Sequence, residues 1–361
     1  MKLEVSIRKN LRDFVLAVEF TACEEVFALL GASGSGKSIT LKCIAGIETP
    51  DEGRIVLNGR TLFDAAKKIN LPPQARRAGY LFQNYALFPN MTVAENILFA
   101  AIGSREEKIL KLKKNITRFK LNGLEDVYPQ KLSGGQRQRV ALARILASPA
   151  EFLLFDEPFS ALDSFLKWQL EPELADILKS YGKAAILVSH DRNEVFRLAD
   201  RVAVLNSGKV EALGSKHEVF ASPPTVAVAQ LTGVKNISRA KKISDDKIFA
   251  EDWQLLLTGK EIPEGLKAIG IRARDFEHSS EVNADDNIFA FQILQVTENE
   301  LTFTLTIRAK ATSNDARPLQ WEVDKNFILG TSDEIFLHLP ADKIIFFLRV
   351  MIWILRRLSL R

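Results

Sequence analysis

Short apolar runs alternate with helix-like segments over residues 1–225 of the chain. Val26–Leu30, Phe152–Phe155 and Ala184–Ser189 are predominantly apolar, as parallel strands buried on both faces are. Turn residues at Asn58-Gly59 and Ser207-Gly208 separate further strand-like runs and predict two hairpins. Strands that alternate with helices indicate a mostly parallel sheet covered by helices, an α/β fold.

Helical periodicity dominates between Met91 and Lys131. We interpret residues from about 84 to 140 as a helical subdomain inserted into the α/β domain. The lysines between Lys108 and Lys120 are interpreted as a solvated helix face rather than a binding patch. Pro172 interrupts a helix-like run from Phe165 to Ser180, and it should kink or restart that helix.

The pattern changes beyond about Lys235 to short strands with period-two alternation. Ile288–Val296, Leu301–Ile307 and Leu319–Val323 are examples, separated by turns rich in Asn, Asp, Gly and Pro. This pattern predicts a small, OB-like β-barrel domain. We therefore expect an α/β domain at 1–225, a linker at 226–235 and an accessory β-barrel domain at 236–361.

Length and composition agree with a two-domain globular chain. It has 361 residues, and its 49 basic and 45 acidic residues give a net charge of +4; this balance does not indicate nucleic acid as a partner. Cys23 and Cys43 lack the spacing of metal ligands, so we expect neither a disulfide framework nor a zinc site, and a reduced setting. The N-terminus has no signal-like apolar core, and the longest apolar stretch, Ile344–Leu355, is too short to span a bilayer.

Residues 31–38 match the phosphate-binding pattern G-x-x-x-x-G-K-[ST]. An apolar strand precedes them and a helix from about Lys37 to Ala45 follows, which makes a chance glycine-rich turn a poor explanation. We expect Lys37 to reach the terminal phosphates of ATP and the Ser38 hydroxyl to bind Mg²⁺. The predicted ATP-binding residues here are Gly31, Ala32, Ser33, Gly34, Ser35, Gly36, Lys37, Ser38 and Ile39.

Two carboxylates end the buried strand that begins at Phe152. We expect Asp156 to hold Mg²⁺, through water, and Glu157 to polarise the water that attacks the γ-phosphate. Many strands end in acidic residues, so this pair alone is a weak indication of a nucleotide site. Together with the phosphate-binding loop it is a strong one.

A second anion-attracting helix start occurs at Leu132-Ser133-Gly134-Gly135-Gln136, which opens a helix reaching Ala147. In isolation these residues could be an ordinary helix cap. The match continues through Arg137–Arg144, and the order of loop, helix start and acidic strand makes the ordinary cap a poor explanation.

In this order the three motifs resemble those of ATP-binding subunits of ABC transporters. The resemblance implies that Gln83, in Tyr80-Leu81-Phe82-Gln83, contacts Mg²⁺ and senses a permease. It also implies that Asp163, in Ser160-Ala161-Leu162-Asp163, lies in the loop that connects two active sites, and that His190 contacts the γ-phosphate and supports the catalytic water.

The resemblance further implies a homodimer that works with an integral-membrane permease and, indirectly, with an extracytoplasmic solute-binding protein. One subunit would present its phosphate loop to ATP and Mg²⁺, and the other its helix start, with Ser133, Gly134, Gly135 and Gln136 as ATP-binding residues. The chain would then be cytoplasmic, peripheral on the inner face of the membrane. We expect the permease contact between Asn84 and Phe99, with exposed Phe88, Met91 and Ile97 as anchors.

Subfamily features resemble ATPases of molybdate or tungstate importers. They are the short segment before the phosphate loop, Lys67–Pro73 leading into Arg76–Tyr80, and Gly270–Arg274. Importers of sulfate, ferric iron or polyamines stay open as alternatives. The aromatic residue that the family stacks on adenine has no clear counterpart; Phe14 is the nearest candidate, and a core role for it is equally open. The arginine-rich ending Arg349–Arg361 is unlike a barrel strand.

Three other classes of protein share part of this pattern. A non-transport ABC ATPase of translation or DNA repair usually has tandem cassettes or a long coiled-coil insertion, and neither is visible here. A small-molecule kinase has no use for Leu132–Gln136. A pure oxyanion-binding module has no use for Glu157 and His190.

Overall fold

The computed structural model describes residues 1–160, 162–280, 286–327 and 334–348. Ala161 and the ending Arg349–Arg361 lie outside the described residues. Compactness divides the chain into two units between His217 and Glu218, and each unit is described by itself. None of the described helices is long and apolar enough to cross a membrane.

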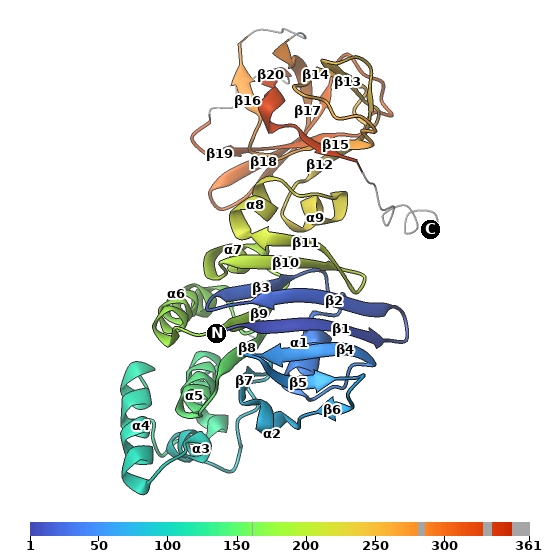
Figure 1. Ribbon diagram of the computed structural model, residues 1–361. Coiled ribbons are helices and arrows are strands. Elements are labelled where there is room, and N and C mark those ends of the chain that lie inside the picture. The colour runs from blue at the N-terminus through green and yellow to red at the C-terminus, as the bar shows by residue number, and fades with distance from the viewer. Residues whose placement is uncertain (161, 281–285, 328–333, 349–361) are drawn as a thin grey trace. The chain divides into compact units, whose positions relative to one another are not determined.

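The first unit is built on an 11-stranded sheet with the order β6-β5-β4-β1-β2-β11-β10-β3-β9-β8-β7 (Figure 1). The last five strands of this order pair in parallel. All of them except the edge strand β7 are buried on both faces, as continuous apolar sequences predict. These strands are β3 (Val26–Leu30), β7 (Ala78–Leu81), β8 (Phe152–Asp156), β9 (Ala185–Ser189) and β10 (Arg201–Asn206).

Antiparallel strands extend this sheet and contain both predicted hairpins. They are β1 (Leu3–Asn10), β2 (Val15–Ala22), β4 (Glu52–Leu57), β5 (Arg60–Asp64), β6 (Ile69–Asn70) and β11 (Lys209–Ser215). Asn58 and Gly59 have φ of 49° and 81°, and Ser207 and Gly208 have φ of 47° and 79°. Two successive positive φ values are what a tight two-residue hairpin requires.

Alternate residues of the parallel strands enter two different cores. Phe152 and Leu154 of β8 pack on one face of the sheet with α1 (Lys37–Ala45), whereas Leu153 and Phe155 pack on the other face. The helices of that second face are α3 (Val93–Ala100), α5 (Gly134–Ala147), α6 (Ser164–Tyr181) and α7 (Arg192–Leu198). Shorter elements are α2 (Pro73–Arg76) and the 3-10 turn η1 (Pro129–Lys131).

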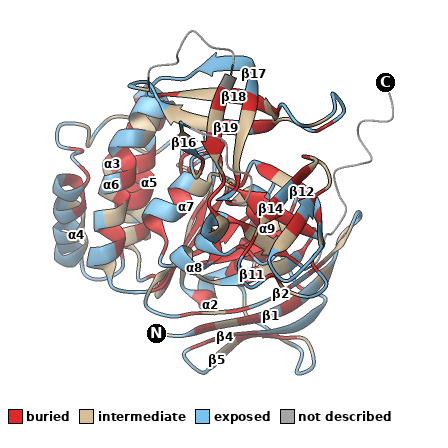
Figure 2. Ribbon diagram, turned by 90° about the horizontal axis from the view of Figure 1, so that it is seen from above, coloured by how far each residue is buried: buried red, intermediate tan, exposed pale blue. Residues whose placement is uncertain are grey.

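The inserted helices include α4 (Arg105–Arg118), most of whose residues are exposed, as Figure 2 shows. This exposure agrees with a solvated, lysine-rich face. Thr92, Ser104 and Ser133 begin α3, α4 and α5, each with a capping box. Such reciprocal caps satisfy the free backbone N–H groups of the first helical turn.

The expected restart at Pro172 does not occur, because α6 continues from Ser164 to Tyr181. Pro172 is exposed, so the hydrogen bond it removes lies on the solvent side of the helix. Leu170, Leu174 and Leu178 are buried in the core on the opposite side and hold the two halves of the helix together.

The second unit contains the short helix α9 (Val226–Leu231) and two five-stranded sheets that share one core. The predicted linker 226–235 thus includes a helix, whose Ala229 packs with Ala268 and Phe347. Helix α8 (Lys216–Ala221) begins just before the division between the units. The domain bounds inferred from the sequence stay a prediction.

The sheets have the orders β14-β13-β12-β15-β21 and β16-β20-β17-β18-β19. The strands are β12 (Asn236–Lys242), β13 (Lys247–Ala250), β14 (Leu255–Thr258), β15 (Ala268–Ile271), β16 (Glu277–Ser279), β17 (Ile288–Glu298), β18 (Thr302–Ala309), β19 (Leu319–Asp324), β20 (Glu334–His338) and β21 (Ile345–Phe347), with the 3-10 turn η3 at Ala341–Lys343. Leu257 and Ile269 of one sheet and Phe291 and Trp321 of the other belong to the shared core. The predicted fold class, an α/β domain with inserted helices and a small β-barrel domain, is confirmed.

Candidate nucleotide-binding site

The predicted phosphate loop joins β3 to α1 and packs tightly against the backbone of β10. A Cβ atom at Gly31 would lie 2.4 Å from the carbonyl oxygen of Leu205, so only glycine fits there. Gly36 has a φ of 102° and is the N-cap of α1, a conformation that glycine adopts without strain. The unpaired N–H groups at the start of α1 therefore face the loop and can bind an anion.

Lys37 is the cation of this loop, and it is only 4% exposed. Its Nζ donates to the carbonyl oxygens of Gly31 and Ala32, both at 2.8 Å. An ammonium group has three donors, so one more is available to a phosphate oxygen. Burial lowers the pKa of Lys37, and the charges of Glu157 and Asp156 oppose that shift.

Ser38 and Asp156 come together from distant parts of the sequence. Ser38 Oγ donates to Asp156 Oδ1 at 2.7 Å, and the Tyr80 hydroxyl donates to Asp156 Oδ2 at 2.9 Å. Burial and the negative charge of Asp156 raise the pKa of Tyr80, so this phenol stays protonated as a donor. A hydroxyl and a carboxylate are oxygen ligands that suit Mg²⁺.

The orienting role of Tyr80 was not part of the sequence prediction. The pairing of strands is the observation that reveals this role. Tyr80 of β7 pairs with Leu154 of β8, which lies two residues before Asp156. Knowing that these strands are parallel neighbours would have placed the phenol beside the carboxylate.

Glu157 and His190 meet at the carboxyl ends of β8 and β9. His190 Nδ1 lies 3.2 Å from Glu157 Oε1, and the His190 side chain is 53% exposed. Glu157 has a φ of 48°, a strained value for a residue with a side chain, and its N–H donates to the carbonyl of Val188 at 3.0 Å. Strain of this kind concentrates at functional sites. The His190 side chain is open to solvent, whereas that of Glu157 is 19% exposed.

The helix start at Ser133 is built as a cap. Ser133 Oγ accepts from the N–H of Gln136 at 3.2 Å, and Gln136 Oε1 accepts from the N–H of Ser133 at 2.9 Å. Gly134 lies beside Leu162, and Gly135 is buried against Leu166. Within the part of the chain that the structure describes, no hydrogen bond or ion pair connects 133–136 with 31–38.

Asp163 and Gln83 are exposed. Asp163 Oδ1 accepts from the N–H of Leu166 at 2.9 Å and so caps α6. Gln83 lies two residues after the end of β7, the strand that contains Tyr80. Ile39 is half-buried, and its side chain packs against the core. Phe14 packs against the same core beside Gly36 and Gly208.

The predicted permease contact needs one correction. Ile97 is fully buried in the core between α3 and α5, because it lies four residues after buried Val93 on the inner face of α3. Phe99 takes its place on the surface: it is 64% exposed, and its ring centroid lies 4.7 Å from that of Phe88. Met91 is half-buried.

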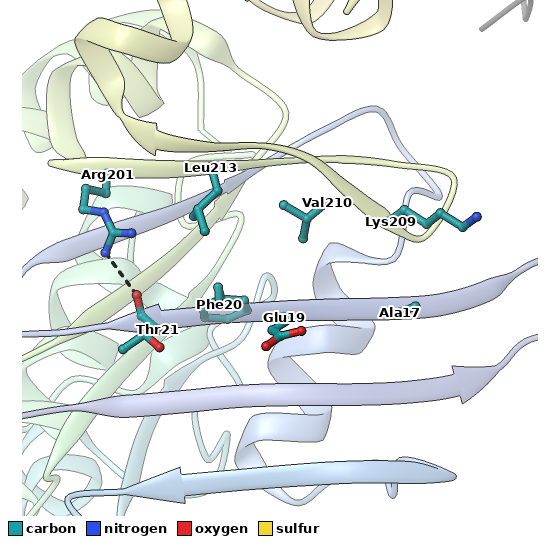
Figure 3. A pocket seen from close by; sticks show the side chains of 8 residues that line it. All are labelled: Ala17, Glu19, Phe20, Thr21, Arg201, Lys209, Val210 and Leu213. Carbon is teal, nitrogen blue, oxygen red and sulfur yellow. Dashed lines mark hydrogen bonds between the residues drawn. The ribbon is translucent and has the colours of Figure 1, made fainter. Parts of the chain in front are cut away.

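A separate groove opens between β2 and β11, which pair only at Ala17 and Lys209 (Figure 3). Beyond that pair the strands separate, and Arg201 spans the gap by donating to the carbonyl of Thr21 at 3.1 Å. None of the residues that line this groove belongs to the predicted nucleotide site. The hydrogen bond from the Arg201 guanidinium stabilises the gap between the strands.

A strand–loop–helix phosphate site with an adjacent acidic strand defines a nucleotide-binding cassette, and comparison with known proteins gives its family. Residues 18–160 match the family model described as ABC transporter. The chain is 38% identical over 284 residues to a molybdenum import ATP-binding protein of Paramagnetospirillum magneticum, covering 76% of this chain and 77% of that protein. The chain belongs to the family of ABC transporter ATP-binding proteins.

Other import ATP-binding proteins match over shorter lengths. A sulfate/thiosulfate import ATP-binding protein of Caulobacter vibrioides is 44% identical over 225 residues, which cover 59% of this chain and 63% of that protein. A spermidine/putrescine import ATP-binding protein of Acidothermus cellulolyticus is 43% identical over 219 residues, covering 60% and 56%.

Solved structures agree with this placement. A dimeric ATP-binding cassette in a post-hydrolysis state, bound to ADP and Pi, has a TM-score of 0.50 at 27% identity, covering 60% of this chain and 99% of that one. A component of an ABC transporter complex of Clostridium perfringens has a TM-score of 0.54 at 28% identity, covering 61% and 90%.

Proposed function

We propose that this chain binds and hydrolyses ATP as the motor subunit of an ABC importer. The observation that carries the proposal is the meeting of five side chains at one edge of the sheet: Lys37, Ser38, Asp156, Glu157 and His190. A kinase that transfers phosphate to a small molecule would not need the Glu157–His190 pair beside the loop, whereas activating a water molecule does.

Each residue has a distinct task in the proposed reaction. Lys37 and the amide groups at the start of α1 bind the β- and γ-phosphates. Ser38 and Asp156, with Gln83, would hold Mg²⁺, which when bound neutralises charge on these phosphates. Glu157 accepts the proton of the attacking water. The ring of His190 orients Glu157 through Nδ1 and presents its other nitrogen to the γ-phosphate.

The site of a single chain is incomplete in this proposal. Among the described residues, the helix start at Ser133 makes no hydrogen bond with the phosphate loop of its own chain. Its cap occupies the N–H groups of Ser133 and Gln136, which leaves those of Gly134 and Gly135 for an anion. A second copy would place this helix start against the γ-phosphate, and Asp163 would connect the two sites. A homodimer related by two-fold symmetry is therefore the proposed working unit.

The proposed partners follow from the import ATP-binding proteins among the relatives. We place the permease contact at the exposed pair Phe88 and Phe99. The chain would then act on the cytoplasmic face of the membrane, held there by the permease, with a solute-binding protein on the other side and no nucleic acid.

The proposed cargo is an oxyanion, molybdate or tungstate. The support is the alignment with the molybdenum import relative, which extends over 284 residues at 38% identity. The alignments with the sulfate/thiosulfate relatives of Brucella melitensis and Mesorhizobium japonicum extend over 266 and 260 residues at the same identity. Transport by vesicles containing the chain, its permease and its binding protein is the test. Uptake of sulfate or spermidine without uptake of molybdate would refute this cargo and leave the ATPase proposal intact.

The ATPase proposal is tested by Lys37→Ala, with Lys42→Ala on the same helix as the control. Among the described residues, Lys37 is the one buried cation at the loop. Lys37→Ala removes it, so equilibrium binding of labelled ATP should be lost and phosphate release should stop. The control should bind and hydrolyse ATP like the wild type. Undiminished affinity in Lys37→Ala would sink the site assignment.

A further inference from the structure

A cluster of buried charges lies between α6 and α7, outside the residues that the proposed reaction uses. Lys167 Nζ lies 2.5 Å from Asp191 Oδ2, 3.3 Å from Glu194 Oε2 and 3.7 Å from Glu171 Oε1. The side chains of Glu171 and Glu194 are only 6% and 4% exposed, and Arg197 Nε contacts Glu171 at 2.6 Å. Carboxylates buried as deeply as those of Glu171 and Glu194 require a nearby cation. Lys167 lies beside both of them and beside the less buried Asp191.

The backbone of Lys167 connects the cluster to Asp163, one of the predicted functional residues. The N–H of Lys167 donates to the carbonyl of Asp163 at 3.0 Å, which closes the first turn of α6. Asp163 is the N-cap of this helix. The ammonium group is therefore held one helical turn from the loop that we propose to connect the two active sites.

The other side of the cluster holds the loop that carries His190. Asp191 Oδ1 accepts from the N–H groups of Asn193 at 2.8 Å and Glu194 at 3.4 Å and so caps α7. The N–H of Asp191 donates to Ser189 Oγ at 2.9 Å. His190 stands between these two residues, so the contact of Lys167 with Asp191 restrains the backbone beside the histidine.

We propose that Lys167 is a positioning residue for ATP hydrolysis, which holds the loop of His190 at a set place relative to the turn that begins with Asp163. The inference rests on the proposed function. The chain of contacts runs from Asp163 through Lys167 and Asp191 to His190, whose Nδ1 is 3.2 Å from Glu157 Oε1. Phosphoryl transfer is sensitive to such placement, since an error of about 1 Å can cost on the order of 100-fold in rate.

The test compares Lys167→Met with Lys179→Met, which removes an exposed ammonium group from the last turn of the same helix. Lys167→Met should lower kcat by about 10- to 100-fold and leave the affinity for labelled ATP unchanged, because the phosphate loop is intact. Lys179→Met should match the wild type. Lys167→Arg should restore most of kcat, because a guanidinium can still bond Asp191 and Glu194.

Two further variants separate positioning from folding. Asp191→Asn keeps an oxygen that can cap α7 but loses the charge facing Lys167, so it should lower kcat in the same way even if Lys167→Met fails to fold. In a His190→Ala background, Lys167→Met should lower the residual rate no further, since the lysine acts through the histidine.

A normal kcat in both Lys167→Met and Asp191→Asn would overturn the inference. It would also be overturned if the loss of kcat in the double variant Lys167→Met/His190→Ala equalled the product of the two single losses. A wild-type chain that releases no phosphate from Mg-ATP would instead refute the proposed function itself. Thermal unfolding of each variant identifies a loss of the folded state.

Discussion

Glu157 has a strained backbone conformation, and this conformation directs its carboxylate towards His190. Its φ of 48° turns the chain sharply at the end of β8, and the N–H bond to Val188 of the neighbouring strand holds this turn. Without the turn, the carboxylate would continue the alternation of the strand and point into one of the cores. The cost of a left-handed residue is about 1–3 kcal/mol, and it places an acid at the open edge of the sheet.

The ionisation of Glu194 should make the free energy of unfolding depend on pH. Burial raises its pKa from 4.5 to about 7, and the nearby Lys167 opposes that shift. The raised pKa means that the folded state favours the protonated acid. Its contribution to stability is thus present below pH 4.5 and is lost as the pH rises through 7.

We therefore expect Glu194→Gln, which cannot ionise, to gain stability relative to the wild type as the pH rises. The difference in free energy of unfolding should change by about 3 kcal/mol between pH 4.5 and pH 8. Urea unfolding at both pH values measures it, and Glu106→Gln on the exposed face of α4 is the control. A difference that stays constant with pH would contradict the raised pKa.

At the scale of elements, α5 connects the predicted helix start at Ser133 to the proposed permease surface. Arg144 in its last turn donates to the carbonyls of Tyr85 at 3.1 Å and Ala86 at 2.8 Å, and its guanidinium carbon lies 5.1 Å from the centroid of the Phe88 ring. A displacement of the proposed permease contact at Phe88 should therefore displace the whole of α5.

Cysteine cross-linking tests where the permease binds. In a background of Cys23→Ser, which removes the exposed native thiol, Phe99→Cys should cross-link to a permease in reconstituted membranes, because Phe99 lies beside Phe88 on the surface. Leu110→Cys on α4, 69% exposed, is the matched control and should not. Equal yields at both positions would argue against a specific contact at Phe88 and Phe99.

For the whole molecule, the separation of Ser133 from the phosphate loop predicts a dimer that forms around ATP. Glu157→Gln keeps the size of the side chain but cannot accept the proton of water, so hydrolysis should fall by about 100-fold or more. Binding should persist, because Lys37 and Ser38 are unchanged. ATP trapped in this way should hold two chains together.

Size-exclusion chromatography of Glu157→Gln should show a dimer with Mg-ATP and a monomer with ADP. Adding Ser133→Arg should abolish the dimer, since its bulk would occupy the place of the γ-phosphate. Hydrolysis at the wild-type rate would show that Glu157 is not the base. An inactive variant that never dimerises would refute the shared site and leave the base assignment standing.

The features that depend on local order could be predicted from the sequence alone: the phosphate loop, the strands around it, both hairpins and the acids at the end of β8. Each is specified by neighbouring residues, through backbone freedom or periodic burial. Tertiary structure decided what depends on which elements are neighbours. Tyr80 reaches Asp156 only because β7 lies beside β8, and Lys167 reaches Asp191 only because α6 packs near α7. The same packing buried Ile97 and carried α6 through Pro172, since contacts between distant segments outweigh local preference when they bury an apolar face.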